Sequence, residues 1–321
     1  MAKLAKERAT GGRRLPGWAR RGLIALGALV VVAWALAPAA RGVALVANRS
    51  NRVTPSPHAA GIPVREVHFS ATDGVRLAGW LAIASPNSPT IILVHGFKST
   101  RVSMLAWARF LYAADYNVLL YDSRGCGASA GWGIGLGASE PNDIIGAARY
   151  LAGLPGLSNK RIGALGVSLG AGDVILAAAR EPRLLGIVAD SPWADERPQL
   201  DRMGGLPLGP LAIPVLPYEP ALVDSLIGAR LEDASPARVA ARIAPRALLV
   251  ITSADDANAT TAPADQARIF AAAKQPKSQW IAPSGGHAGA YYAHTSEYQQ
   301  RVIAFFAQFV GLPANAVTAG A

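Results

Sequence analysis

Residues 161–170 read RIGALGVSLG, and this stretch decides the fold. The apolar residues up to Val167 predict a buried strand, and the residues after Ser168 predict a helix that continues to about Arg180. Between strand and helix lies a G-x-S-x-G pattern, in which small glycines permit a tight turn. Such a turn projects a serine hydroxyl above the sheet, and the helix N-terminus behind it favours developing negative charge. We therefore predict that Ser168 is a nucleophile.

The rest of the body alternates strands with helices after an initial hairpin at residues 65–70 and 75–83. Alternation of this kind predicts a mostly parallel, eight-stranded α/β sheet with helices on both faces. The other strands are expected at residues 90–94, 117–121, 184–189, 247–252 and 278–281, and helices at 104–114, 143–151, 265–274 and 297–310.

One segment breaks this alternation, between the strand that ends near residue 189 and the one that starts near 247. Five prolines among apolar residues and glycines forbid a long helix there. We predict a small proline-rich lid, at about residues 194–240, over the carboxyl edge of the sheet. The prolines are Pro207, Pro210, Pro214, Pro217 and Pro220.

The positive charge of the chain is concentrated at its N-terminus. Residues 1–21 hold seven basic side chains against one acid, a net charge of +6, and leave +4 of the chain's +10 for the other 300 residues. The body is therefore only mildly basic, and it has no basic stripe interleaved with aromatic residues. We predict that nucleic acid is not a partner.

Residues 22–40 read GLIALGALVVVAWALAPAA and contain no charge. Nineteen helical residues at ~1.5 Å each nearly cross a ~30 Å hydrocarbon layer, so we predict a single-pass transmembrane anchor. Because positive charge stays on the cytoplasmic side, the N-terminus should be cytoplasmic and the catalytic domain extracytoplasmic. The alternative is a cleaved signal peptide and a secreted protein, since residues 37–39, Ala-Pro-Ala, resemble a cleavage site.

These patterns divide the chain into five parts. Residues 1–21 form a basic cytoplasmic segment, 22–40 the anchor, 41–63 a polar tether, 64–311 the catalytic domain and 312–321 a flexible tail. A single cysteine, Cys126, excludes an intramolecular disulfide.

A serine nucleophile needs a base. Among five histidines, His287 lies in a glycine-rich loop directly after the last strand, where an imidazole can reach Ser168. His294 begins the last helix and is expected at the surface.

The base in turn needs an orienting carboxylate. Asp255 and Asp256 follow the strand at 247–252 and precede His287, and either could serve. Asp190, after an earlier strand, is a third candidate.

The oxyanion formed at the attacked carbonyl needs hydrogen-bond donors. The backbone N–H of Leu169 is one candidate, and the N–H of Phe97, in the loop His95-Gly96-Phe97 after strand 90–94, is the other. His95 itself is then structural. No metal ligands or cofactor-binding pattern are present in the sequence, and the mechanism needs no cofactor.

Over roughly residues 65–310 the chain resembles the α/β-hydrolase superfamily. The resemblance rests on the His-Gly pair at 95–96, the run Asp-Ser-Arg-Gly-Cys-Gly-Ala-Ser at 122–129, the turn at Ser168, and Gly-His at 286–287. It is similar to membrane-anchored serine hydrolases of the esterase and prolyl-peptidase-like kind.

The acid loop departs from the pattern of that family, which has H-G-x-x-D followed by Val-Pro. Thr252-Ser253 replaces the His-Gly pair, and residues 258–261, Asn-Ala-Thr-Thr, stand where Val-Pro is expected. Counting three positions past Ser253 gives Asp256, which we prefer over Asp255 as the acid.

The sequence thus predicts a serine hydrolase that cleaves a carboxylic ester through an acyl-enzyme. Its substrate would be a small or lipid-like acyl compound, and the membrane would be its other partner. Two alternatives remain at this stage: a serine peptidase of the prolyl-peptidase-like type, and a non-catalytic anchored binding module on the same fold.

Overall fold

The computed structural model describes residues 15–48, 60–195, 206–208, 211–213 and 218–313. Several predicted segments therefore lie partly outside the described residues, namely the basic segment, the tether, the lid and the tail.

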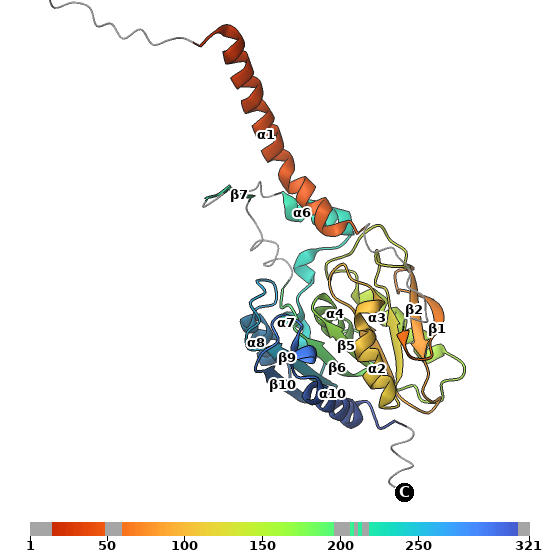
Figure 1. The fold of residues 1–321 in the computed structure, drawn as a ribbon. Helices are drawn as coiled ribbons and strands as arrows, with labels where there is room; N and C mark the ends of the chain where they lie inside the picture. Colours follow the sequence, from red (N-terminus) through yellow and green to blue (C-terminus); the bar gives the residue numbers. More distant parts are fainter. Residues whose placement is uncertain (1–14, 49–59, 196–205, 209–210, 214–217, 314–321) are drawn as a thin grey trace, which may run out of the picture.

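Eight strands form one sheet in the order β1-β2-β4-β3-β5-β6-β9-β10 (Figure 1). The pairs β1–β2 and β2–β4 are antiparallel, and every other neighbouring pair is parallel, so the prediction of a mostly parallel eight-stranded sheet is confirmed. The strands are β1 (Arg65–Ser70), β2 (Arg76–Ala82), β3 (Thr90–Val94), β4 (Asn117–Tyr121), β5 (Ile162–Val167), β6 (Leu184–Asp190), β9 (Ala247–Ser253) and β10 (Lys277–Ala282).

Helices cover both faces of the sheet. One face packs against α3 (Pro141–Gly153), α4 (Leu169–Ala178) and α8 (Pro263–Ala272). The other packs against α2 (Leu105–Ala113) and α10 (Thr295–Phe309). Shorter helices connect these elements: α7 (Pro236–Val239), α9 (Ala290–Ala293), and 3₁₀ turns at Arg101–Met104, Leu231–Asp233 and Ala240–Arg242.

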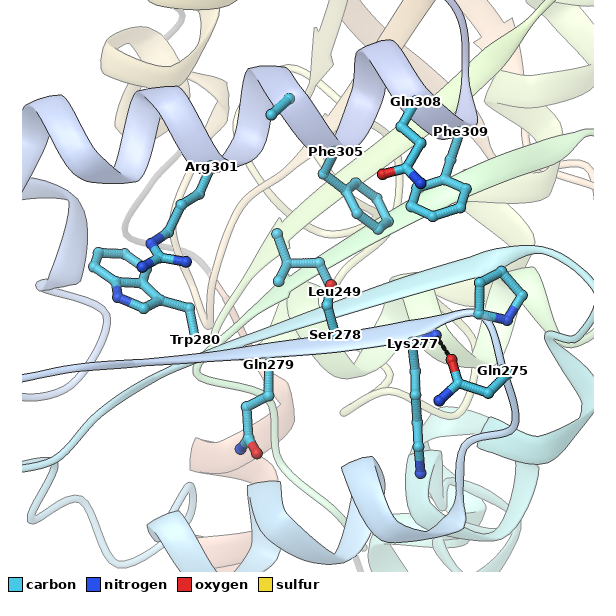
Figure 2. Close-up of a pocket in the computed structure, with 12 residues that line it drawn as sticks. Leu249, Gln275, Lys277, Ser278, Gln279, Trp280, Arg301, Phe305, Gln308 and Phe309 are labelled. Carbon is cyan, nitrogen blue, oxygen red and sulfur yellow. Dashed lines mark hydrogen bonds between the residues drawn. The ribbon is translucent and has the colours of Figure 1, made fainter.

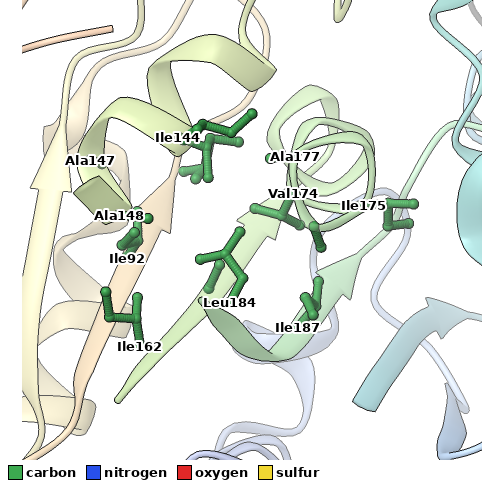
Figure 3. Close-up of a cluster of buried hydrophobic side chains, with 14 of the residues drawn as sticks. Ile92, Ile144, Ala147, Ala148, Ile162, Val174, Ile175, Ala177, Leu184 and Ile187 are labelled. Carbon is green, nitrogen blue, oxygen red and sulfur yellow. The ribbon is translucent and has the colours of Figure 1, made fainter. Parts of the chain in front are cut away.

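Strand β3 illustrates why these strands are continuously apolar. All five of its residues are buried, because helices cover both of its faces. Ile92 packs with Ile144 and Val174 under α3 and α4 (Figure 3), whereas its neighbour Ile91 belongs to the core on the opposite face. Each fully buried side chain of this size contributes about 1.5–3 kcal/mol.

The N-terminal helix α1 (Gly17–Val46) is longer than the apolar run at 22–40 and extends into the predicted tether. Most of its large apolar side chains from Trp18 to Leu36 are exposed, and it is long and apolar enough to cross a membrane, as an anchor or a signal sequence would be. The helix continues past the apolar run because Arg41 finds a partner in Glu219, at 2.5 Å, and because Val46 is buried against the domain.

The described part of the predicted lid contains a short hairpin, β7 (Leu206–Leu208) with β8 (Leu211–Ile213), and helix α6 (Glu219–Ile227). Helix α6 is short, as the prolines of this segment require. Pro220 lies in its first turn, where the backbone N–H that proline lacks would have no partner within the helix. Helix α6 packs against α1 (Figure 1).

Two glycines of α3 offer a matched test of how closely this helix approaches the sheet. A Cβ atom on Gly146 would lie 2.3 Å from the carbonyl oxygen of Ser70, whereas one on Gly153 would meet nothing within 4 Å. We expect Gly146→Ala to destabilise the domain by about 1–3 kcal/mol through overpacking. Gly153→Ala should leave stability unchanged or raise it by up to about 1 kcal/mol. Thermal unfolding of both variants in detergent measures this difference, and equal melting temperatures would contradict the close packing.

Candidate active site

Ser168 occupies the turn between β5 and α4 with φ 57° and ψ −117°, a backbone conformation that costs a non-glycine residue about 1–3 kcal/mol. Its N–H donates to the carbonyl oxygen of Asp190 at 2.9 Å, which ties the turn to β6. The glycine two positions later is required, because a Cβ on Gly170 would lie 2.6 Å from the carbonyl oxygens of Val94 and His95. The turn therefore holds the serine at the carboxyl edge of the sheet.

His287 reaches this serine from the loop after β10. Its Nε2 lies 2.9 Å from Ser168 Oγ, within hydrogen-bonding distance. The loop is shaped by Gly285 and Gly286, both at positive φ, and is fixed on its far side by the Ala288 N–H, which donates to Ser191 Oγ at 3.1 Å. With its proton on Nδ1, the imidazole can accept the serine proton at Nε2.

Of the two adjacent aspartates, Asp256 faces the imidazole. It is buried, and its Oδ2 lies 3.2 Å from His287 Nδ1. Asp255 is exposed and instead accepts the backbone N–H groups of Gly286, at 2.8 Å, and Gly285, at 3.3 Å. Those hydrogen bonds, that of Gly286 foremost, lower the pKa of Asp255. Asp256 is thus placed to orient the ring, and Asp255 to hold the loop that carries it.

The third candidate, Asp190, serves another network. It accepts hydrogen bonds from Tyr298 Oη at 2.9 Å and from Ser191 Oγ at 3.1 Å. Burial raises the pKa of Asp190 to about 6. Its carboxylate supports the residues behind the His287 loop.

Thr261 also contacts the imidazole, and the sequence analysis did not single it out. Its Oγ1 lies 2.8 Å from His287 Nδ1 and 3.4 Å from Asp256 Oδ2, where its hydroxyl donates to the carboxylate. Its carbonyl oxygen accepts the side-chain N–H of Gln266 at 2.6 Å. The available signal was the departure at residues 258–261, where threonines stand in place of the expected Val-Pro.

The predicted oxyanion donors lie beside the nucleophile. Phe97 and Leu169 both line the same pocket as Ser168. Gly96 lets the loop come this close, since a Cβ there would be 3.3 Å from Ser168 Cβ. His95 is buried, and its Nε2 accepts the N–H of Ser123 at 3.0 Å, so the ring braces the loop from behind.

A cavity of about 530 Å³ opens onto Ser168 and His287. The large apolar side chains of its wall come from distant segments: Leu45, Phe97, Leu136, Val167, Leu169 and Trp193. Among the described residues that line it, none is Asp, Glu, Lys or Arg. In the same part of the chain, no group of three or more His, Cys, Asp or Glu side chains would hold a metal ion.

A second groove, of about 500 Å³, lies between β10 and α10 (Figure 2). It is lined by the first residues of β10, with Arg301 stacked over Trp280 at 5.2 Å and Phe305 beside them. This is the amino end of the parallel strands, away from the carboxyl edge where ligands bind in open α/β sheets. The groove is therefore separate from the candidate active site.

Comparison with known proteins places the chain in a family. The model of the family described as X-Pro dipeptidyl-peptidase (S15 family) matches residues 65–297. Among solved structures, the esterase Pf2001 of Pyrococcus furiosus superimposes with a TM-score of 0.67 and 23% sequence identity, over 82% of this chain and all of that one. At that identity the likeness shows the fold alone, and it agrees with the predicted α/β-hydrolase fold.

Two fungal proteins are similar over part of their length. The thiohydrolase aneE of Aspergillus aculeatus is 31% identical over 130 residues, which are 40% of this chain and 41% of that protein. The polyketide transferase grgF of a Penicillium species is 30% identical over 148 residues, 43% of this chain and 48% of that protein. The match thus spans less than half of the length of these relatives.

Because Asp255 and Asp256 make different contacts, we expect their substitution by asparagine to lower kcat by different amounts. Asp256→Asn should lower kcat by about 10⁴-fold, because an amide facing Nδ1 no longer stabilises the imidazolium or the required tautomer. Asp255→Asn keeps an oxygen acceptor for the loop N–H groups and should cost far less, about tenfold at most. Steady-state hydrolysis of a p-nitrophenyl ester measures both. Equal losses would contradict the assignment.

Thr261 is expected to act as a positioning residue. Thr261→Val removes the hydroxyl beside Nδ1 and should lower kcat by about tenfold, the value of one hydrogen bond, with KM unchanged. Thr261→Ser restores the hydroxyl and should recover most of the rate. If valine and serine variants behave alike, the hydroxyl has no role in orienting the ring.

Proposed function

The chain belongs to the X-Pro dipeptidyl-peptidase (S15) family of hydrolases, and we propose that it is a serine hydrolase that cleaves carboxylic esters. The observation that carries the proposal is the alignment of Ser168, His287 and Asp256. His287 Nε2 lies 2.9 Å from Ser168 Oγ, and His287 Nδ1 lies 3.2 Å from Asp256 Oδ2. The imidazole thus stands between nucleophile and acid, as a base in such a triad must.

In the proposed reaction, Ser168 Oγ attacks the acyl carbonyl while His287 Nε2 takes its proton. The N–H groups of Phe97 and Leu169 stabilise the oxyanion. The imidazolium then gives its proton to the leaving alcohol, and an acyl-enzyme remains on Ser168. A water molecule, deprotonated by the same ring, releases the carboxylic acid and restores the serine.

The pocket favours an ester over an X-Pro dipeptide. A dipeptidyl substrate carries a charged amino terminus, and a charge brought into an apolar pocket needs a partner there. The described lining offers no carboxylate. The two fungal relatives are a thiohydrolase and a polyketide transferase by name, and neither is named as a peptidase.

Peptide cleavage is the second candidate, because the matching family is described as an X-Pro dipeptidyl-peptidase. The same triad chemistry would then act on an amide, and specificity would come from residues around the pocket.

We further propose that α1 anchors the enzyme in a membrane. The exposed apolar side chains of α1, together with the basic residues that precede it, support an N-terminus on the cytoplasmic side and a domain on the other side.

A fluorophosphonate probe and a substrate series test this function. Wild type should be labelled, and Ser168→Ala should not, because only an activated serine reacts. His294→Ala is a matched control, since His294 contacts Ser284 at 3.2 Å and not Ser168. Hydrolysis of p-nitrophenyl esters should exceed that of aminoacyl-proline amides. Preference for the amides would identify a peptidase, and absent labelling would identify a binding module.

A further inference from the structure

We propose that the C-terminal end of α1 is a wall of the active-site pocket, and that this pocket takes long-chain acyl esters directly from the bilayer in which α1 is anchored. The inference rests on the proposed function and names the substrate class and route of entry.

The C-terminal end of α1 is fixed to the domain. The Arg41 guanidinium binds Glu219 on α6 at 2.5 and 2.6 Å, and the Glu219 carboxylate is almost entirely buried. Gly42 brings the two helices close, since a Cβ there would lie 3.2 Å from Val223. Val46 is buried, and its carbonyl oxygen accepts the N–H of Ile134 at 2.9 Å. These contacts hold the C-terminal end of α1 against the described part of the domain.

The same end of α1 reaches the active site. Leu45 lines the pocket together with Phe97 and Leu136, on the side of the proposed oxyanion loop. Lys98, next to Phe97, donates from Nζ to the carbonyl oxygen of Ala44 at 2.5 Å. The substrate pocket and the membrane anchor thus share a wall.

The pocket consequently lies close to the bilayer. The continuous run of exposed apolar side chains on α1 ends at Leu36, with Val43 an isolated exposed residue beyond it. Leu45 is nine residues past Leu36, about 14 Å along the helix. The polar interface of a bilayer occupies roughly 5–8 Å of that distance on each side. The wall of the pocket is therefore just outside the headgroups.

The lid segment adds a second apolar feature on this side. The two described strands of this segment, β7 and β8, contain no Lys, Arg, Asp or Glu. In Figure 1 the strand β7 of this segment stands outside the body of the domain, on the side where α1 leaves it. The pocket lining, which holds no Asp, Glu, Lys or Arg among the described residues, favours a substrate that is itself dissolved in the bilayer.

The experiment uses the full chain in phosphatidylcholine vesicles and two probes. Water-soluble p-nitrophenyl butyrate reports the chemistry, and a fluorogenic two-chain diacylglycerol reports access. The diacylglycerol is placed either in the enzyme's vesicles or in separate ones. We expect hydrolysis in the shared bilayer to be at least about tenfold faster, because sharing a bilayer raises the effective substrate concentration.

A matched pair of variants tests the shared wall. Leu45→Trp fills the pocket and should lower kcat/KM for long-chain p-nitrophenyl esters by about tenfold or more relative to short ones. Val43→Trp changes an exposed residue of the same helix and should leave the chain-length profile as in wild type.

The outcomes are distinguishable. If butyrate is not hydrolysed, the proposed function itself fails. If butyrate is hydrolysed but the diacylglycerol is not, or is cleaved equally in both vesicle arrangements, only entry from the bilayer is overturned. Equal effects of Leu45→Trp and Val43→Trp would show that α1 does not form the wall.

Discussion

The arrangement of the site depends on one tight turn, in which the chain passes from β5 to α4 at Ser168. The turn requires glycine at positions 166 and 170, because backbone atoms lie where a Cβ of either residue would be. A hydrogen bond from the Ser168 N–H to the carbonyl oxygen of Asp190 fixes the turn to β6. A larger residue at either glycine would force strand and helix apart. Since β5 is a central strand, the same displacement would move the edge at which the other two loops meet.

The two loops that complete the site are coupled to each other. Asp255 binds the backbone of the His287 loop, while Asp256 and Thr261 contact its ring. One loop therefore fixes both the position and the rotation of the imidazole. Neighbouring aspartates achieve this division because successive residues point in different directions, one toward the exposed loop and one into the buried site.

Local patterns were sufficient to predict the eight strands of the main sheet, the five longer helices that cover it and the turn at Ser168, because each depends on residues close together in the sequence. His287 was also predictable, since the carboxyl ends of parallel strands meet at one edge. The contact of Thr261 was not, because it depends on how the loop after β9 folds back over 26 residues to the imidazole. The true end of α1 depends on Glu219, which lies 178 residues from Arg41 and carries no local signal.

The docking of α1 also bears on whether the N-terminal segment is an anchor or a signal peptide. Cleavage after Ala39 would remove Pro38, which is buried, and Ala35, whose carbonyl oxygen accepts a hydrogen bond from Tyr218. Both lie on the N-terminal side of the cleavage site, yet both contact or pack against the folded chain. A signal peptide leaves no such contacts behind, because the mature domain must be stable without it. These two contacts therefore support the proposed retention of the helix, whereas Leu45, which lines the pocket, lies on the C-terminal side of the cleavage site and would remain in either case.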